Sequence, residues 1–391
     1  MIDYLEVSSE KNRDNRFTKE DVLSVSGEYG IVNQIEFQGR SFAGASVSNY
    51  GVVENGDVVY TKSPLKSNPY GIIKTNKGIP GIVSTLYAVY KPKEITDSKF
   101  VQIYFELDSR MNSYMHPLVN KGAKNDMKVS AENALKGMVS FPKKDEQEMI
   151  SLYFSTIDHL ITLHQRKCEQ TKNLKKYMLQ KMFPQNGAKV PEIRFNGFTH
   201  DWEQRKLGDM GSTYTGLSGK TKEDFGHGDA KFITYMNVFS NPVANLDMTE
   251  SVEIDSKQNC VKAGDVFFTT SSETPEEVGM SSVMPENADN IYLNSFCFGY
   301  RPTEKFDLNY LAYVLRTESF RKEMTFLAQG ISRYNISKNK VMEVEIPIPS
   351  LDEQSRVGQY FKNLDTLITL HQRKCDELKK MKKFMLQNMF I

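Results

Sequence analysis

The chain contains the same eight-residue string, ITLHQRKC, at 161–168 and at 368–375. The match is wider than this string, since 157–183 and 364–390 share 18 of 27 residues at a constant offset of 207. A repeat constrains the fold strongly, because both copies must form the same structure. Weaker matches continue upstream at nearly the same offset. The chain is therefore two copies of one unit, each a divergent body followed by a nearly identical tail.

The tails are predicted to be long helices. Ser350 and Glu353 have the spacing of a capping box, which marks a helix start. Each tail predicts a helix of about 40 residues, or about 60 Å at ~1.5 Å per residue. Such a helix needs a partner for its apolar stripe, and the other tail is the expected one. The alternative, two unrelated core helices, does not explain the shared identity. The stripe of the second tail contains Leu364, Ile368, His371, Cys375, Leu378, Met381, Met385 and Met389.

The two bodies are predicted to be mixed α/β domains. Short apolar runs between turn residues predict strands, and longer periodic segments predict helices. The predicted strands are 58–62, 82–90, 266–270 and 291–300, and the predicted helices are 100–115 and 308–324. The domain boundaries follow from the repeat: a first body at 1–141, a first tail at 142–184, a second body at 185–348 and a second tail at 349–391.

Composition and motifs argue against several classes of protein. The four cysteines form no CxxC pair, which fits a reducing cytoplasm and argues against structural zinc. No run of about 18 apolar residues is present to cross a membrane, and the N-terminus is charged, unlike a signal peptide. The segment 211–221 resembles a phosphate loop, but Tyr214 stands where the motif needs glycine. We therefore predict no catalytic, cofactor-binding or metal-binding residues.

The net charge of +1 identifies no binding partner, so a nucleic-acid surface must be local. Residues 58–93 contain six lysines and no acidic residue, with four tyrosines among them. Lysines beside aromatic residues suit phosphate contact, although a solvated lysine face is an equally good explanation. In the second body the basic residues come later, at Arg316, Arg321, Lys322, Arg333, Lys338 and Lys340.

Several segments resemble the specificity (S) subunit of type I restriction-modification enzymes. The resemblance covers essentially the whole chain, and its marks occur in the family's order. The segment 190–210, here called the lead-in, is similar to the one that precedes a target-recognition domain in this family. The first body has no such segment, because its counterpart would fall before Met1. The other marks are PKKDEQ at 142–147, QKMFP at 180–184, QGISRYNIS at 329–337 and PSLDEQ at 349–354.

The resemblance implies an α+β fold. Two target-recognition domains would be separated by two long, antiparallel, conserved helices, with pseudo-two-fold symmetry. Each domain would recognise one half of a bipartite site in double-stranded DNA, and the helices would set the gap and dock two methylation subunits. Two restriction subunits would complete the complex, with S-adenosylmethionine, ATP and Mg bound by partner subunits. The alternative is a helical scaffold or adaptor that does not bind DNA sequence-specifically.

Loop residues in the two bodies are the candidates for DNA contact. Arginine and asparagine suit guanine and adenine edges, whereas lysine and serine more often contact phosphate. The candidates in the first body are Lys62, Ser63, Lys66, Asn68, Tyr70, Lys121, Lys124, Asn125 and Lys128. Those in the second body are Thr269, Thr270, Ser271, Ser272, Ser332, Arg333, Tyr334 and Asn335.

Overall fold

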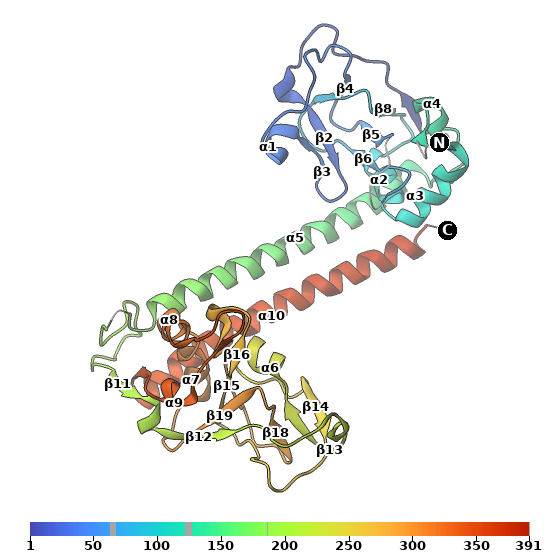
Figure 1. Cartoon of the computed structure of the whole chain (residues 1–391). Coiled ribbons are helices and arrows are strands. Elements are labelled where there is room, and N and C mark those ends of the chain that lie inside the picture. Colours follow the sequence, from blue (N-terminus) through green and yellow to red (C-terminus); the bar gives the residue numbers. More distant parts are fainter. Residues whose placement is uncertain (63–67, 122–126, 186, 391) are drawn as a thin grey trace. The chain divides into compact units, whose positions relative to one another are not determined.

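A computed structural model describes all of the chain except residues 63–67, 122–126, 186 and 391, and it also leaves the side chains of 120, 121, 127 and 128 undescribed. The chain divides into two compact units (Figure 1). Unit 1 consists of Met1–His164 and Arg373–Ile391, and unit 2 of Gln165–Gln372. Each unit contains one body and a part of each long helix. Among the described residues no helix has the length and apolar character to cross a membrane.

The body of unit 2 is built on an antiparallel sheet in the order β12-β19-β15-β17. Its inner strand β15 is buried along its whole length, and Phe268 stacks on Phe298 of β19. A second sheet has the order β14-β13-β18, and α7 and α8 pack into the main core. The bounds are β12 Gly211–Thr215, β13 Phe225–Ile233, β14 Thr249–Val252, β15 Val266–Thr269, β17 Ser281–Val283, β18 Ile291–Leu293, β19 Cys297–Pro302, α7 Leu308–Val314 and α8 Glu318–Leu327.

The body of unit 1 repeats this plan. Its main sheet has the order β1-β8-β5-β6, which places equivalent strands in the same sequence as in unit 2. Smaller sheets pair β4 with β7 and β2 with β3. The bounds are β1 Leu5–Val7, β2 Leu23–Ser26, β3 Gly30–Asn33, α1 Gln34–Gln38, β4 Gly51–Val53, β5 Val58–Thr61, β6 Ile73–Thr75, β7 Gly81–Val83, β8 Tyr87–Pro92, α2 Ser98–Tyr104, α3 Asp108–Met115 and α4 Ala131–Ala134.

Four predicted elements are each two elements in the structure. The segment 82–90 contains β7 and β8, and 291–300 contains β18 and β19. A turn interrupts each pair, where Tyr87 N–H donates to Ser84 O and Phe296 N–H donates to the Asn294 side chain. The predicted helices 100–115 and 308–324 likewise split into α2 with α3 and α7 with α8. The apolar pattern crosses these turns, and so it did not indicate them.

The two long helices are confirmed. Helix α5 spans Lys144–Lys181 and α10 spans Leu351–Asn388, each 38 residues long and so about 57 Å. Both begin and end at positions that differ by the repeat offset of 207. Cys168 and Cys375 are buried, as expected for small residues in the stripe. Ser350 caps the backbone N–H of Glu353 as predicted, but the Glu353 carboxylate binds Arg194 and Trp202 instead of completing the capping box.

Each unit shows the same antiparallel contacts between its portions of α5 and α10 and the residues that directly follow these helices. In unit 2, Lys175 Nζ lies 2.6 Å from Asp365 Oδ1, and the rings of Phe183 and Phe361 stack at 5.7 Å. The equivalent contacts in unit 1 join residues 207 positions away. There Lys382 Nζ lies 2.7 Å from Asp158 Oδ1, and the rings of Phe154 and Phe390 stack at 6.3 Å. The internal repeat is therefore also a structural pseudo-symmetry.

Candidate functional site

Two of the predicted DNA-contact loops in unit 2 meet in a short ladder. Strand β16, Ser271–Ser272, pairs antiparallel with β20, Tyr334–Asn335. The loop before β20 is closed by reciprocal backbone hydrogen bonds between Gln329 and Asn335. Ser332, Arg333 and Asn335 are exposed at this loop. Residues more than 60 positions apart in the sequence thus form one site.

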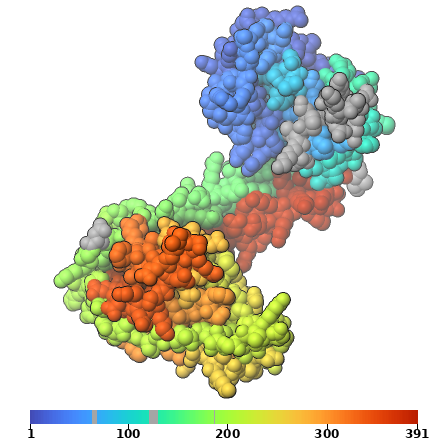
Figure 2. Space-filling model, in the orientation of Figure 1, coloured from blue at the N-terminus to red at the C-terminus, as the bar shows by residue number. Residues whose placement is uncertain are grey.

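The ladder forms one side of a cavity of about 670 Å³. Its lining combines serines, two acidic residues and one arginine with apolar side chains of α6, Tyr235–Ser240. The segment containing α8 and α9 (Lys338–Met342), orange in Figure 2, covers much of the visible face of unit 2. The lining residues are Tyr235, Met236, Phe239, Ser271, Ser272, Glu273, Glu277, Ser332 and Arg333.

The sequence interpretation missed helix α6 as part of this site. Thr234 caps the helix, and the rings of Tyr235 and Phe239, one turn apart, stack at 6.0 Å. The Tyr235 hydroxyl donates to Ser271 O at 2.8 Å, which ties α6 to β16. Burial raises the pKa of Tyr235, so this hydroxyl stays a donor. The TYMNVF pattern, a cap followed by aromatic residues at i and i+4, was the available signal.

The two threonines predicted to contact DNA have internal partners. Thr269 is fully buried, and its hydroxyl accepts a hydrogen bond from Met280 N–H at 3.0 Å. The Thr270 hydroxyl donates to Phe296 O at 2.9 Å. Both contacts hold the chain where β15 ends and β16 begins. These residues shape the site, and the exposed groups at its rim come from the loop before β20.

Two arginines of the later basic cluster point into the protein. The Arg316 guanidinium donates to the carbonyl oxygens of Ser281, Val238, Phe239 and Asn241 at 2.8–3.1 Å. Burial, helped by nearby Arg321, lowers the pKa of Arg316 to about 10. These contacts fix the C-terminal end of α6.

Arg321 acts in the same way on the loop after β16. It donates to the carbonyl oxygens of Gly279 and Glu276 at 2.7 and 2.8 Å, and also to that of Val278. Burial lowers the pKa of Arg321 to about 10. The two arginines therefore hold two segments that contribute to the cavity lining, and their guanidinium groups are bound by carbonyl oxygens within the protein.

The candidates in unit 1 are only partly described. Asn68 donates to Asp108 Oδ1 at 2.5 Å, and the ring of Tyr70 meets that of His116 edge-on at 6.0 Å. Lys62 is half-buried, and burial lowers its pKa. Lys121 and Lys128 lie on β9 (Asn120–Lys121) and β10 (Met127–Lys128), which pair with each other. Ser63, Lys66, Lys124 and Asn125 lie outside the described residues.

Three of the described lysines of 58–93 are buried or have partners within unit 1. Lys74 is buried, and burial lowers its pKa. Lys91 pairs with Glu10 at 3.1 Å, and Lys93 donates to Ile2 O at 2.8 Å. These lysines therefore contribute to packing and to local ion pairs.

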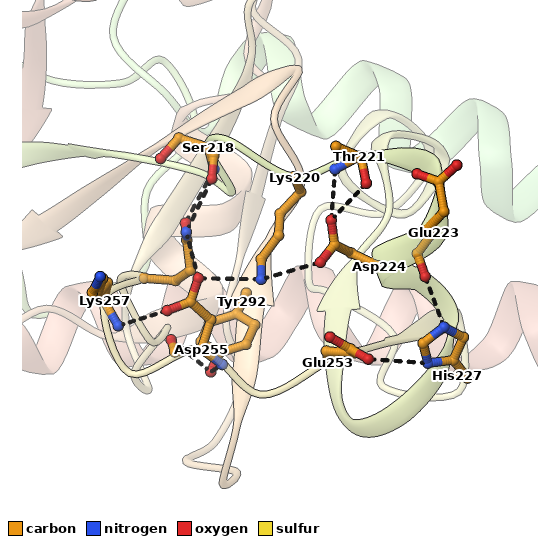
Figure 3. A network of polar contacts seen from close by, with 11 residues as sticks. Ser218, Lys220, Thr221, Glu223, Asp224, His227, Glu253, Asp255, Lys257 and Tyr292 are labelled. Atoms are coloured by element: carbon orange, nitrogen blue, oxygen red, sulfur yellow. Dashed lines mark hydrogen bonds and ion pairs between the residues drawn. The ribbon is translucent and has the colours of Figure 1, made fainter.

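The phosphate-loop-like segment is held by an internal polar network (Figure 3). Lys220 Nζ lies 3.1 Å from Asp255 Oδ2 and 3.7 Å from Asp224 Oδ1. Asp255 also accepts hydrogen bonds from the backbone N–H of Lys257 and from the side chain of Gln258. The lysine of the motif thus joins two loops through their carboxylates.

This network predicts an unusually acidic carboxyl group. The Lys257 N–H, then Gln258 and Lys220, lower the pKa of Asp255 to about 2. A depressed pKa stabilises the fold above the unfolded value of about 3.9, and this contribution is lost as the pH falls through about 2. NMR titration of the side-chain carboxyl should show this pKa, and Lys220→Met should raise it. Lys322→Met, which removes an exposed lysine of α8, should leave it unchanged; a normal pKa in the wild type would contradict the network.

Comparison with known proteins shows which proteins the chain is similar to. Residues 199–380 match the model of the type I restriction modification DNA specificity domain. The type I restriction enzyme MjaVIII specificity subunit of Methanocaldococcus jannaschii is 25% identical over 330 residues, or 81% of this chain and 74% of that protein. Residues 199–380 therefore match a type I restriction modification DNA specificity domain, and the chain is similar to type I restriction-modification specificity subunits.

Solved structures show the fold of this specificity-subunit family. The S subunit of the type I restriction-modification system of M. genitalium aligns with a TM-score of 0.56 at 12% identity, over 100% of this chain and 94% of that one. A second solved structure concerns complex assembly and conformational transition of the type I R-M system. One of its chains aligns with a TM-score of 0.52 at 16% identity, over 98% of this chain and 94% of that one. The predicted fold class, two mixed domains with two long conserved helices, is confirmed.

Proposed function

We propose that this chain is a specificity subunit that recognises a bipartite sequence in double-stranded DNA, with the body of each unit contacting one half. The main support is that the two bodies have the same main-sheet order but different loop residues. Two domains that recognise different half-sites are expected to share a fold and differ in their loops, because base recognition depends on the side chains that reach the groove.

The long helices carry the second part of the proposal. Their near-identical sequences suit the docking of two identical methylation subunits, one for each half-site, and the pair would set the gap between the halves. Half-sites on one face of a duplex lie about one helical turn, ~34 Å, apart or at a multiple of it. Two restriction subunits would complete a cytoplasmic complex. This chain would have no catalytic role, and partner subunits would bind S-adenosylmethionine, ATP and Mg.

Selection from a random duplex library tests the function. The chain, co-purified with its methylation subunit, should enrich two short motifs separated by a fixed unspecified gap. The salt dependence of binding should be steep, since phosphate contacts release counterions. Recovery of DNA with no enriched sequence would overturn sequence-specific recognition and favour the scaffold alternative. A single enriched half-site would show that only one body contacts its half.

Arg333 provides a more local prediction. Arg333→Met should relax one or two base positions in the half-site of unit 2, because a bidentate arginine–guanine pair is worth about 1–3 kcal/mol. The half-site of unit 1 serves as the internal control and should not change. Lys322→Met removes another exposed basic residue of unit 2, which pairs with Glu318 at 2.8 Å, and should keep both motifs. An unchanged motif in Arg333→Met would exclude base contact by this arginine.

A further inference from the structure

The lead-in of unit 2 is anchored on the first turns of α10. Arg194 donates to both carboxylate oxygens of Glu353 at 2.7 and 2.8 Å, and the Trp202 indole N–H donates to the same carboxylate at 3.1 Å. Glu353 is 2% exposed in this setting. An acidic residue on the helix is thus fully paired by the segment that covers it.

The same segment continues along this face and then adds a strand. The ring of Phe195 meets Tyr360 edge-on at 6.2 Å, and the Arg356 guanidinium lies 5.3 Å from the centre of the Phe198 ring. Strand β11, Glu203–Lys206, then pairs antiparallel with β21, Glu345–Ile348. The lead-in therefore contacts three side chains of α10 and one strand edge.

In the described part of unit 1, the same face is exposed. The repeat offset of 207 relates Glu353, Arg356 and Tyr360 to Glu146, Met149 and Tyr153. Glu146 is exposed, Met149 is 69% exposed and Tyr153 is 39% exposed. The counterpart of β21 is 138–141, which pairs with no strand in the described part of the chain, and Met138 is 96% exposed. Exposed apolar residues grouped in this way are typical of a binding surface.

The starts of the two helices are held in the same way, so the two faces are equivalent. The Gln147 side chain accepts from Asp97 N–H at 2.9 Å and donates to Pro142 O at 2.8 Å. Its counterpart Gln354 accepts from Asp307 N–H at 3.1 Å and donates to Pro349 O at 3.0 Å. Asp97 and Asp307 cap the equivalent helices α2 and α7. The two faces therefore share the helix start, the glutamate and the tyrosine, and they differ in the cover and in Met149, which stands where unit 2 has Arg356.

We infer that the face formed by Glu146, Met149, Tyr153 and the 138–141 edge binds a peptide segment with the chemistry of the lead-in. That segment would supply an arginine and an indole to Glu146. It would place aromatic rings against Tyr153 and Met149, where the thioether replaces the guanidinium found in unit 2. It would then add a strand to the edge at 138–141. The reason for this choice of occupant is that the lead-in covers the equivalent face in unit 2.

A peptide with the sequence 190–210 tests this inference on the full chain. Fluorescence anisotropy should show saturable binding of the labelled peptide. Glu146→Gln should weaken it about tenfold or more, because hydrogen bonds to a charged acceptor are lost. Glu148→Gln is the matched control, since it changes an exposed neighbouring glutamate of the same helix, and should leave the affinity unchanged. Peptides with Arg194→Ala or Trp202→Ala should also bind more weakly.

Photo-crosslinking locates the bound peptide. A photoreactive residue at Leu152, 68% exposed at the border of this face, should capture the peptide, whereas one at its unit 2 counterpart Gln359 should not. Absence of binding, binding indifferent to Glu146→Gln, or capture only at Gln359 would each overturn the inference. Concentration-dependent dimerisation through this face that the peptide does not displace would also overturn it, in favour of a second copy as the occupant.

Discussion

Replacing Arg316 with methionine is expected to lower the free energy of unfolding of unit 2 by about 3 kcal/mol. The Arg316 guanidinium donates hydrogen bonds to four carbonyl oxygens of the α6 and β17 segments. Methionine has no hydrogen-bond donor, so these acceptors would lose the arginine N–H groups. Each unsatisfied buried group costs about 1–3 kcal/mol. Release of a buried charge, whose pKa is lowered to about 10, offsets part of this loss.

Urea unfolding followed by tryptophan fluorescence provides the measurement. Trp202 is the single tryptophan of the chain and is buried in unit 2, so its signal follows that unit. Arg333→Met is the matched control, because Arg333 is exposed, and should change stability by less than about 0.5 kcal/mol. Equal midpoints for the two variants would show that the Arg316 hydrogen bonds contribute no net stability. DNA selectivity for the unit 2 half-site should also fall in Arg316→Met, since α6 loses its support.

Glu353→Ala is the second substitution with a large expected effect, about 3 kcal/mol. It removes the acceptor of three hydrogen bonds and leaves the largely buried Arg194 and Trp202 without their partner. Loss of one member of a buried pair typically costs about 3–5 kcal/mol, and the residual exposure of Arg194 favours the lower end. The lead-in should then detach locally from α10.

The repeat supplies the control for this prediction. Glu146→Ala removes the equivalent glutamate of α5, which is exposed, and should change stability by less than about 0.5 kcal/mol. Urea midpoints read by circular dichroism avoid the direct effect of Glu353 on the tryptophan. Similar losses in both variants would contradict the difference in cover between the two faces. Glu353→Gln should fall between the wild type and Glu353→Ala, because it keeps the hydrogen-bond acceptor but not the charge.

The sequence alone determined the repeat, the two long helices and the resemblance to specificity subunits. Helix formation depends on residues three and four positions apart, so the stripe of 364–390 was sufficient to predict α10. Sequence chemistry also selected Ser271, Ser272, Tyr334 and Asn335, which the structure brings together in one ladder. Their role in DNA contact stays a prediction.

Only the tertiary structure decided which polar residues face solvent. In the sequence, Arg316 and Arg321 belong to a basic cluster, but in the structure they donate hydrogen bonds to carbonyl oxygens 35 to 78 residues away. Helix α6 joined the site only because Tyr235 meets β16 across 36 residues. The 207-residue offset likewise gave Glu146 and Glu353 the same place on a helix, while the lead-in covers one and leaves the other exposed. Burial depends on segments distant in sequence, and local patterns carry no information about these partners.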